Sequence, residues 1–466
     1  MSLDTVRAQI DSDFDAHLER VRRFVRQPSI SGTGEGIAEM AEMVASEIWA
    51  LGGHARVVPT AGHPVVHGHI DAGAARTLLF YGMYDVQPVA GEDWVAPPFG
   101  AQIVDFQDFG KCVVGRGISN QKGPLAAFFN TLHAFRDSGT ALPVNVKFVV
   151  EGEEELGSPH LPDFVESHRD ALRADGCFFA SFGQDPRGIP YVFLGVKGIL
   201  FVELSVRGGE WGGPTRRMIH GSNAAWIASP PWRLVHVLKT LVDDEERILV
   251  AGFYDDVRPP TPKDEALLER LAGVFDEAVA LKQNDARRFK HPGSGVQQLR
   301  HMLFDPTLNI DGMEAGYMGP GTKTLLPHEA RVRLDVRMVP DMEPQRVVEL
   351  LRGHLDRLGL EGLDFTVMDS YPWSRTDPDA PVAQALMRAI RAEGLEPYAW
   401  PRTAGSAPFY LFTRTLGIPT VAGGLGHGGR AHSPNEYATV EGIRAHERSV
   451  AAFLFEFASD AGPTGG

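Results

Sequence analysis

Residues 123–152 read GPLAAFFNTLHAFRDSGTALPVNVKFVVEG, a helical segment followed by a short apolar strand. A second apolar strand, RTLLFYG at 76–82, precedes this helix, and a third, GCFFAS at 176–181, comes after the pair. Strands that alternate with helices are typical of βαβ units, in which the strands lie parallel in one sheet. This part of the sequence therefore predicts an α/β fold with a mostly parallel sheet.

The pattern changes after about residue 198. Alternating strands appear in FVELSVRG (201–208) and ARVRLDVRMV (330–339), together with a charged helical stretch near 262–290 and the helical EPQRVVELLRGHLDRLG (343–359). We interpret residues 199–374 as a smaller α+β domain inserted into the first domain. The first domain would then consist of residues 1–198 and 375–466, where helices and buried strands alternate again.

The composition excludes several classes of protein. A chain of 466 residues is too long for one hydrophobic core, and 43% hydrophobic with 23% charged residues is usual for a soluble globular protein. The 60 acidic residues outnumber the 45 basic ones, giving a net charge of -15, so the phosphate backbone of a nucleic acid would be repelled. We expect no nucleic-acid partner.

The location of the protein can also be predicted. The first 29 residues place apolar side chains at helical spacing among charges, which indicates an amphipathic helix and not a signal peptide. No stretch approaches the roughly 20 apolar residues of a membrane span. Cys112 and Cys177 lie in apolar segments and are predicted to be buried free thiols, as in a reducing compartment. We expect a cytoplasmic protein without membrane contact.

Two polar segments are candidates for chemistry. EGEEELGS at 151–158 places three adjacent acids directly after a predicted strand, where their mutual repulsion is costly unless a cation or a proton is shared. The carboxyl ends of strands are also where open α/β sheets bind ligands. A solvated acidic loop is the alternative interpretation. GHGGRAHSPNE at 426–436 holds two histidines in a glycine-rich loop, and His is the commonest metal ligand.

These segments belong to a collinear set that resembles one known family. The set also contains YGMYDVQP (81–88), GRGISNQKG (115–123), GFYDDV (252–257), NIDG (309–312) and GYMGPGTKTLLP (316–327). It is similar to the aminoacylase, carboxypeptidase G and carnosine dipeptidase family of zinc metallopeptidases, and most closely to the dipeptidase branch. The resemblance implies a three-layer zinc-exopeptidase catalytic domain with two bridged zinc ions, and an inserted lid that mediates dimerisation.

The resemblance also implies active-site roles, some of which this sequence has lost. The orienting Asp corresponds to Asp85, the general base to Glu154, and two metal ligands to Glu155 and His432. The other three ligand positions, a His, the bridging Asp and a further Asp, are occupied by Met83, Asn120 and Ser181.

The pattern of these losses predicts a reduced metal site. In the family, one ion is held by the residues that became Met83 and Ser181, and the other by those that match Glu155 and His432. Asn120 could still offer an amide oxygen, a poorer ligand than a carboxylate. We expect at most one divalent ion, zinc or manganese, at Glu155, His432 and Asn120. The alternative is a site that binds no metal.

Substrate-handling residues are better kept. By resemblance, His220 matches the lid histidine that reaches a neighbouring subunit's active site and polarises the scissile carbonyl, which implies a homodimer. Other residues fall where the family holds the substrate's carboxylate: Arg337, Lys323, Arg402, Gly405 and Ser406. A planar guanidinium suits that task because it binds a carboxylate through two hydrogen bonds.

Three hypotheses for function remain open at this point. The first is a hydrolase that acts on a small peptide, N-acyl amino acid or other amide-like substrate, with Glu154 as general acid and base. The second is an inactive relative that binds a peptide-like ligand or a partner. The third is a metal-free enzyme that uses Glu154, Glu155 and His432 for proton transfer.

Overall fold

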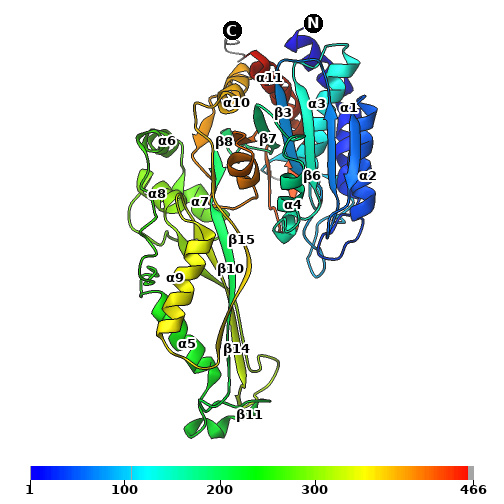
Figure 1. The fold of residues 1–466 in the computed structure, drawn as a ribbon. Helices are drawn as coiled ribbons and strands as arrows, with labels where there is room; N and C mark the ends of the chain where they lie inside the picture. Colours follow the sequence, from blue (N-terminus) through cyan, green and yellow to red (C-terminus); the bar gives the residue numbers. More distant parts are fainter. Residues whose placement is uncertain (1, 107, 460–466) are drawn as a thin grey trace.

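The predicted first domain, called the catalytic part below after the role that the resemblance implies, is built on an eight-stranded sheet in the upper half of Figure 1. The computed structural model describes residues 2–106 and 108–459. The strand order is β1-β2-β6-β3-β7-β18-β8-β17, and the four central strands β6, β3, β7 and β18 are parallel. The bounds are β1 (His54–Val58), β2 (Val65–Ile70), β3 (Thr77–Met83), β6 (Asn145–Glu151), β7 (Gly176–Ala180), β8 (Tyr191–Phe193), β17 (Tyr398–Trp400) and β18 (Thr420–Gly423).

Helices cover both faces of this sheet, which gives the predicted three layers. Leu78 and Phe80 of β3 pack into a core formed with α1 (Leu3–Arg26), α2 (Ile37–Ala50), α3 (Lys122–Asp137), α10 (Pro381–Ala392) and α11 (Val440–Ser459). Leu79 and Tyr81 point the other way, into a second core with α4 (Leu161–Ser167) and the helical turn Leu411–Thr415. Strands buried on both faces are continuously apolar, which is why the sequence identified them.

A small antiparallel sheet joins two glycine-rich loops beside the central sheet. Its order is β19-β20-β5-β4, with β4 (Gln102–Phe106), β5 (Gly110–Val114), β19 (Gly428–Gly429) and β20 (Tyr437–Thr439). The backbone amide of Gly115 also donates to the carbonyl oxygen of Glu436 at 3.0 Å. The loop that carries Asn120 is thereby fixed to the C-terminal loop that carries His432.

The lower part in Figure 1 corresponds to the expected inserted domain, called the lid below, and is a four-stranded antiparallel sheet with helices on one face. The order is β12-β14-β10-β15, with β10 (Gly198–Arg207), β12 (Thr307–Ala315), β14 (Glu329–Met338) and β15 (Leu363–Tyr371). α5 (Pro230–Leu241) and α9 (Pro344–Arg357) bury apolar residues against β10 and β14. The chain enters and leaves the lid through the paired strands β9 (Gly195–Val196) and β16 (Ser374–Arg375). The domain limits at 198/199 and 374/375 remain a prediction.

One predicted element differs from the structure. The charged stretch near 262–290 forms two helices, α6 (Pro262–Ala272) and α7 (Glu277–Gln283), and not one long helix. Phe275 packs into a small core with α6 and α8 (Val296–Phe304), and the side chain of Asp276 caps α7 by accepting the amide of Val279. An N-cap starts a new helix because it satisfies an otherwise unpaired backbone donor.

The cysteine prediction is confirmed, since Cys112 on β5 and Cys177 on β7 are both buried and free. The N-terminal amphipathic helix is confirmed as α1. None of the helices within residues 2–106 and 108–459 combines the length and apolar character needed to cross a bilayer.

Candidate active site

The candidate site lies at the edge of the central sheet where its parallel strands end. Met83 on β3 is in register with Glu151 on β6, and the neighbouring β7 ends at Ala180. The chain after each strand supplies polar side chains to this one edge, among them Asp85 and Glu154. Such an edge is the usual ligand site of an open α/β sheet.

Three of the predicted metal-site residues meet in one cluster. The Asn120 Nδ2 donates to Glu155 Oε1 at 2.8 Å and lies 3.1 Å from His432 Nε2. His432 Nε2 is 3.0 Å from Glu155 Oε2. The Glu155 side chain is only 4% exposed, whereas that of His432 is 55% exposed, so the cluster opens to solvent on the histidine side. The hydrogen bond to Glu155 raises the pKa of His432.

Asp85 holds the acidic segment 151–158 in place through hydrogen bonds to its main chain. It is fully buried, and its carboxylate accepts the backbone amides of Glu154 at 3.2 Å and Glu155 at 3.0 Å. Burial, and then the charge of Glu155, raises the pKa of Asp85 to about 7. Asp85 therefore fixes the positions of the two glutamates through their main chain.

Glu154 stands in a strongly acidic surrounding. Loss of hydration, followed by the charges of Glu155, Asp85 and Glu151, raises the pKa of Glu154. The Glu151 carboxylate accepts from Tyr81 Oη at 2.7 Å, and burial raises the pKa of Glu151 to about 8. Carboxyl groups this close share protons or a cation, so the site is chemically suited to proton transfer.

The other half of the two-metal site that the resemblance implies has no charged side chains at the positions of Met83 and Ser181. Met83 is 1% exposed at the end of β3, and its thioether is a soft ligand poorly matched to zinc among oxygen donors. The buried Ser181 Oγ has no hydrogen-bond partner among the described residues. Of these ligand positions, Glu155 and His432 therefore supply a carboxylate and an imidazole, whereas Met83 and Ser181 supply no charged donor.

Several residues that shape the site were not singled out from the sequence. Glu436 is completely buried, and its carboxylate accepts the backbone amides of Gly117, Ser119 and Asn120 at 2.8–2.9 Å. Gln87 Nε2 donates to Glu155 Oε2 at 2.8 Å. Both lie in sequence segments quoted above, but their hydrogen-bond partners could be identified only from the fold.

The predicted substrate-binding residues separate into three places. Arg337 Nη1 donates to Ser406 Oγ at 2.8 Å, and its Nε donates to Asp335 at 3.0 Å, which fixes the plane of the guanidinium. Gly405 adjoins this pair, and its carbonyl oxygen accepts the backbone amide of Lys197. Arg402 is 1% exposed, and its guanidinium lies over the Phe304 ring at 4.1 Å and donates to the Leu303 carbonyl.

His220 lies at the far end of the lid, on β11 (Ile219–His220), which pairs with β13 (Leu325–Leu326). Figure 1 shows β11 at the bottom of the molecule, remote from β3, β6 and β7 of the same chain. His220 is exposed, and its Nε2 lies 3.1 Å from Thr324 Oγ1, at hydrogen-bond distance. The exposed Lys323 precedes that threonine in the sequence. Within one chain, the structure does not bring His220 and Lys323 to Glu154.

The comparisons with known proteins agree with this architecture. The model of peptidase family M20/M25/M40 matches residues 79–456. The Cys-Gly metallodipeptidase dug1 of Schizosaccharomyces pombe is 27% identical, over 98% of this chain and 99% of its own.

Solved structures are similar as well. The M20 family metallo-carboxypeptidase Sso-CP2 of Sulfolobus solfataricus has a TM-score of 0.88 at 36% identity, covering 95% of this chain and 99% of its own. Human carnosine dipeptidase 1 has a TM-score of 0.82 at 25% identity, covering 98% and 99%. The chain thus belongs to the M20 family of metallopeptidases, in its dipeptidase branch.

Proposed function

We propose that this protein is a cytoplasmic, homodimeric hydrolase of dipeptides or similar N-acyl amino acids that works with at most one divalent ion in each active site. The observation that carries the proposal is the selective loss at the sheet edge. Glu154, Glu155 and His432 are kept, and Glu155 contacts His432, whereas Met83 and Ser181 stand where the family has a His and an Asp ligand. This assembled half, with Glu154 beside it, supports catalysis over the inactive alternative.

The remaining half can hold one ion. Glu155 and His432 supply a carboxylate and an imidazole, and Asn120 can turn its amide to present Oδ1 in place of the Nδ2 that now donates to Glu155. A divalent ion bound there would supply Lewis-acid polarisation of a carbonyl and of water. The exposed side of His432 leaves a path by which the substrate can enter.

Glu154 is the proposed acid and base. Its main chain is held next to that of Glu155 by the carboxylate of Asp85. In this role Glu154 removes a proton from the attacking water and passes it to the leaving amine. The assignment rests on this position at the end of β6.

Arg337 is the proposed anchor for the substrate's carboxylate. The contacts to Asp335 and Ser406 hold its guanidinium at the junction of the lid with the catalytic part. A fixed guanidinium fork discriminates a carboxylate from a neutral group. His220, remote from Glu154 of its own chain, is proposed to serve the active site of the second subunit.

Metal content is the first test. Ions are counted by elemental analysis in the His291→Ala/His301→Ala variant, because these two lid histidines form a separate candidate metal cluster with Asp305. Purified without chelators, this variant is expected to contain no more than one divalent ion per chain. The triple change Met83→His, Asn120→Asp and Ser181→Asp should raise uptake toward two ions, because it restores three charged or strong donors. Close to two ions per chain in the His291→Ala/His301→Ala variant without the triple change contradicts the single-ion site.

The second test replaces the acid and base. Glu154→Gln should reduce turnover of a panel of dipeptides and N-acyl amino acids by about 10²–10⁴-fold, because a neutral amide cannot accept the proton. Glu153→Gln is the matched control, since Glu153 is the neighbouring buried acid and is bonded to His160 at 2.8 Å. Equal activity of the Glu154→Gln variant and the control contradicts the assigned role. Ligand binding without any turnover in the unchanged protein would support the inactive relative instead.

A further inference from the structure

We propose that the lid carries a separate binding site for one zinc-class divalent ion, formed by His291, His301 and Asp305. One ligand atom from each of the three lies within 4.8 Å of the others. His301 Nδ1 is 2.7 Å from Asp305 Oδ2, and the rings of His291 and His301 are stacked with centroids 4.3 Å apart. Across residues 2–106 and 108–459, this is the one group of three His, Cys, Asp or Glu side chains with such geometry.

The local fold pre-arranges these side chains. His301 on α8 and Asp305 at the end of that helix are four residues apart, so they lie on the same helix face. His291 comes from the preceding loop. The buried Gln298 fixes this loop to α8, because its Nε2 donates to the carbonyl oxygens of His291 at 2.8 Å and Gly293 at 2.9 Å. Ligands held by their surroundings lose less freedom when they bind.

The donor types select the ion. Two imidazoles and a carboxylate suit zinc and its neighbours better than the hard ions magnesium and calcium, which prefer oxygen ligands alone. Three protein ligands with a fourth position left to water is the arrangement of many zinc sites. The exposed fractions of His301 and Asp305, 39% and 49%, leave room for that water.

The charge around the cluster favours a cation. The three residues line a cavity of about 1100 Å³ on the lid. Its lining contains the carboxylates of Asp243, Glu245, Glu246, Asp305 and Asp335 against the basic side chains of Arg247, Lys290 and Arg337. The excess of acids lowers the electrostatic cost of bringing a dication into the cavity.

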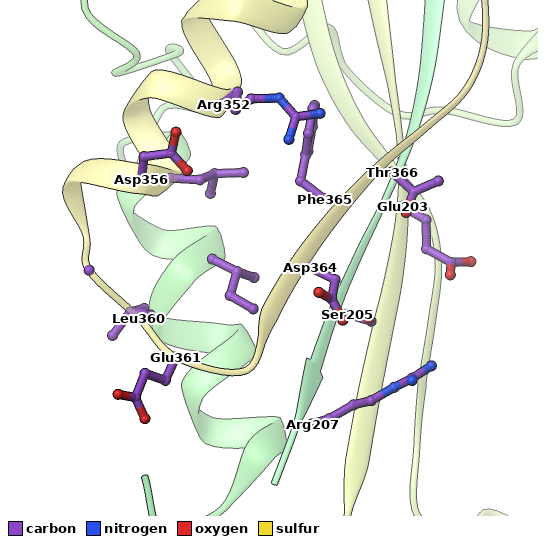
Figure 2. A pocket seen from close by; sticks show the side chains of 13 residues that line it. Glu203, Ser205, Arg207, Arg352, Asp356, Leu360, Glu361, Asp364, Phe365 and Thr366 are labelled. Atoms are coloured by element: carbon purple, nitrogen blue, oxygen red, sulfur yellow. The ribbon is translucent and has the colours of Figure 1, made fainter. Parts of the chain in front are cut away.

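A second cavity on the lid provides no such arrangement. Figure 2 shows this hollow of about 650 Å³ beside α9 and β15, where Arg352 lies over the ring of Phe365. Its lining has no histidine or cysteine, and acids such as Glu203 and Asp364 stand apart from one another. Donor chemistry therefore singles out the His291 cluster.

The site would act on the joint between the lid and the catalytic part. The buried Lys197 precedes β10, and its Nζ donates to the Asp305 carbonyl oxygen at 2.7 Å. The Lys197 backbone amide donates to Gly405 at 3.0 Å. Thr307, two residues after Asp305, is in register with Arg337. An ion at this site would stiffen the corner of the lid that carries the proposed substrate anchor.

The test titrates the full-length protein, stripped by a chelator, with Zn²⁺ alone and follows binding by calorimetry and the spectrum by Co²⁺ substitution. Mutation of a residue that only hydrogen-bonds to a metal ligand typically lowers metal affinity about 10–100-fold. His291→Ala/His301→Ala removes the ligands themselves, so it should lower the Zn²⁺ affinity of one site by more than about 100-fold. His236→Ala, an exposed histidine of α5, is the matched control and should bind as the unchanged protein does.

His432→Ala separates this site from the active site. This variant should keep the Zn²⁺ affinity of the lid site, whether or not the active site of the unchanged protein binds an ion. If the double variant does not fold, Asp305→Asn is used for the same test, because it removes the charge of this ligand and keeps the shape of its side chain. Retention of every Zn²⁺ site in the double and Asp305→Asn variants, or only millimolar binding in the unchanged protein, overturns the proposal. The loss of one site in both, with the His236→Ala protein unaffected, establishes it.

Discussion

The buried His446 is expected to make the stability of the protein fall steeply in mild acid. This histidine on α11 is completely buried, and its Nδ1 is 3.0 Å from the carbonyl oxygen of Leu425. Burial lowers its pKa from the ordinary 6.5 to about 4. His446 is therefore protonated below about pH 6.5 in the unfolded chain, but only below about pH 4 in the folded protein. The stability that His446 contributes is present above pH 6.5 and is lost as the pH falls toward 4.

The size of the effect follows from the shift in pKa. Between pH 7.5 and pH 5, the difference in proton binding amounts to about 2 kcal/mol of the free energy of unfolding. His446→Asn removes the titrating group and keeps an amide donor that can reach Leu425. The assay is urea unfolding of both proteins at the two pH values. The unchanged protein should lose about 2 kcal/mol more than the variant. Equal losses in both proteins refute the reasoning, because the other titrating groups are common to both.

Further predictions concern the substrate anchor, the glycine-rich loop and the dimer. Arg337→Lys should raise KM by about 10–100-fold with little change in kcat, whereas Arg333→Lys, exposed on the same strand, should change neither. Gly424→Ala should lower the free energy of unfolding by about 1–3 kcal/mol, since its Cβ would lie 2.5 Å from the buried histidine ring of α11, and chemical denaturation measures this. Co-expressed His220→Ala and Glu154→Gln chains should regain about one quarter of the unchanged activity if the lid histidine serves the second subunit, and no recovery speaks against a shared site.

The fold could be predicted where an element is buried on both faces, because burial then produces a continuous apolar segment in the sequence. β3, β6 and β7 are apolar on both faces, so their segments were recognised as strands and their parallel arrangement followed from the helix between them. β19 and β20 contain two and three residues, too few to show any period. The charged stretch near 262–290 shows the opposite difficulty, because its helical composition continues through the turn at Phe275 that divides α6 from α7.

The site was predictable in its members but not in the direction of their side chains. Resemblance placed Asn120, Glu155 and His432 together, and the structure brings them within 3.1 Å. The same resemblance grouped Arg402 with Ser406, but the guanidinium of Arg402 points to Phe304. Backbone contacts such as those of Glu436 leave no trace in a sequence.

The division of the central sheet between the two ends of the chain has a consequence for biosynthesis. Cys177 on β7 pairs with Thr420 on β18, so β7 leaves the ribosome without its neighbour, which follows roughly 10–50 s later at ordinary rates of translation. During that interval an apolar strand edge is exposed, while the lid can form its antiparallel sheet and return the chain through the Gly195–Arg375 pairing. The edge of β7 therefore stays open to pairing with other chains in this window, and the contact between Glu155 and His432 can form only late, after residue 432 has been made.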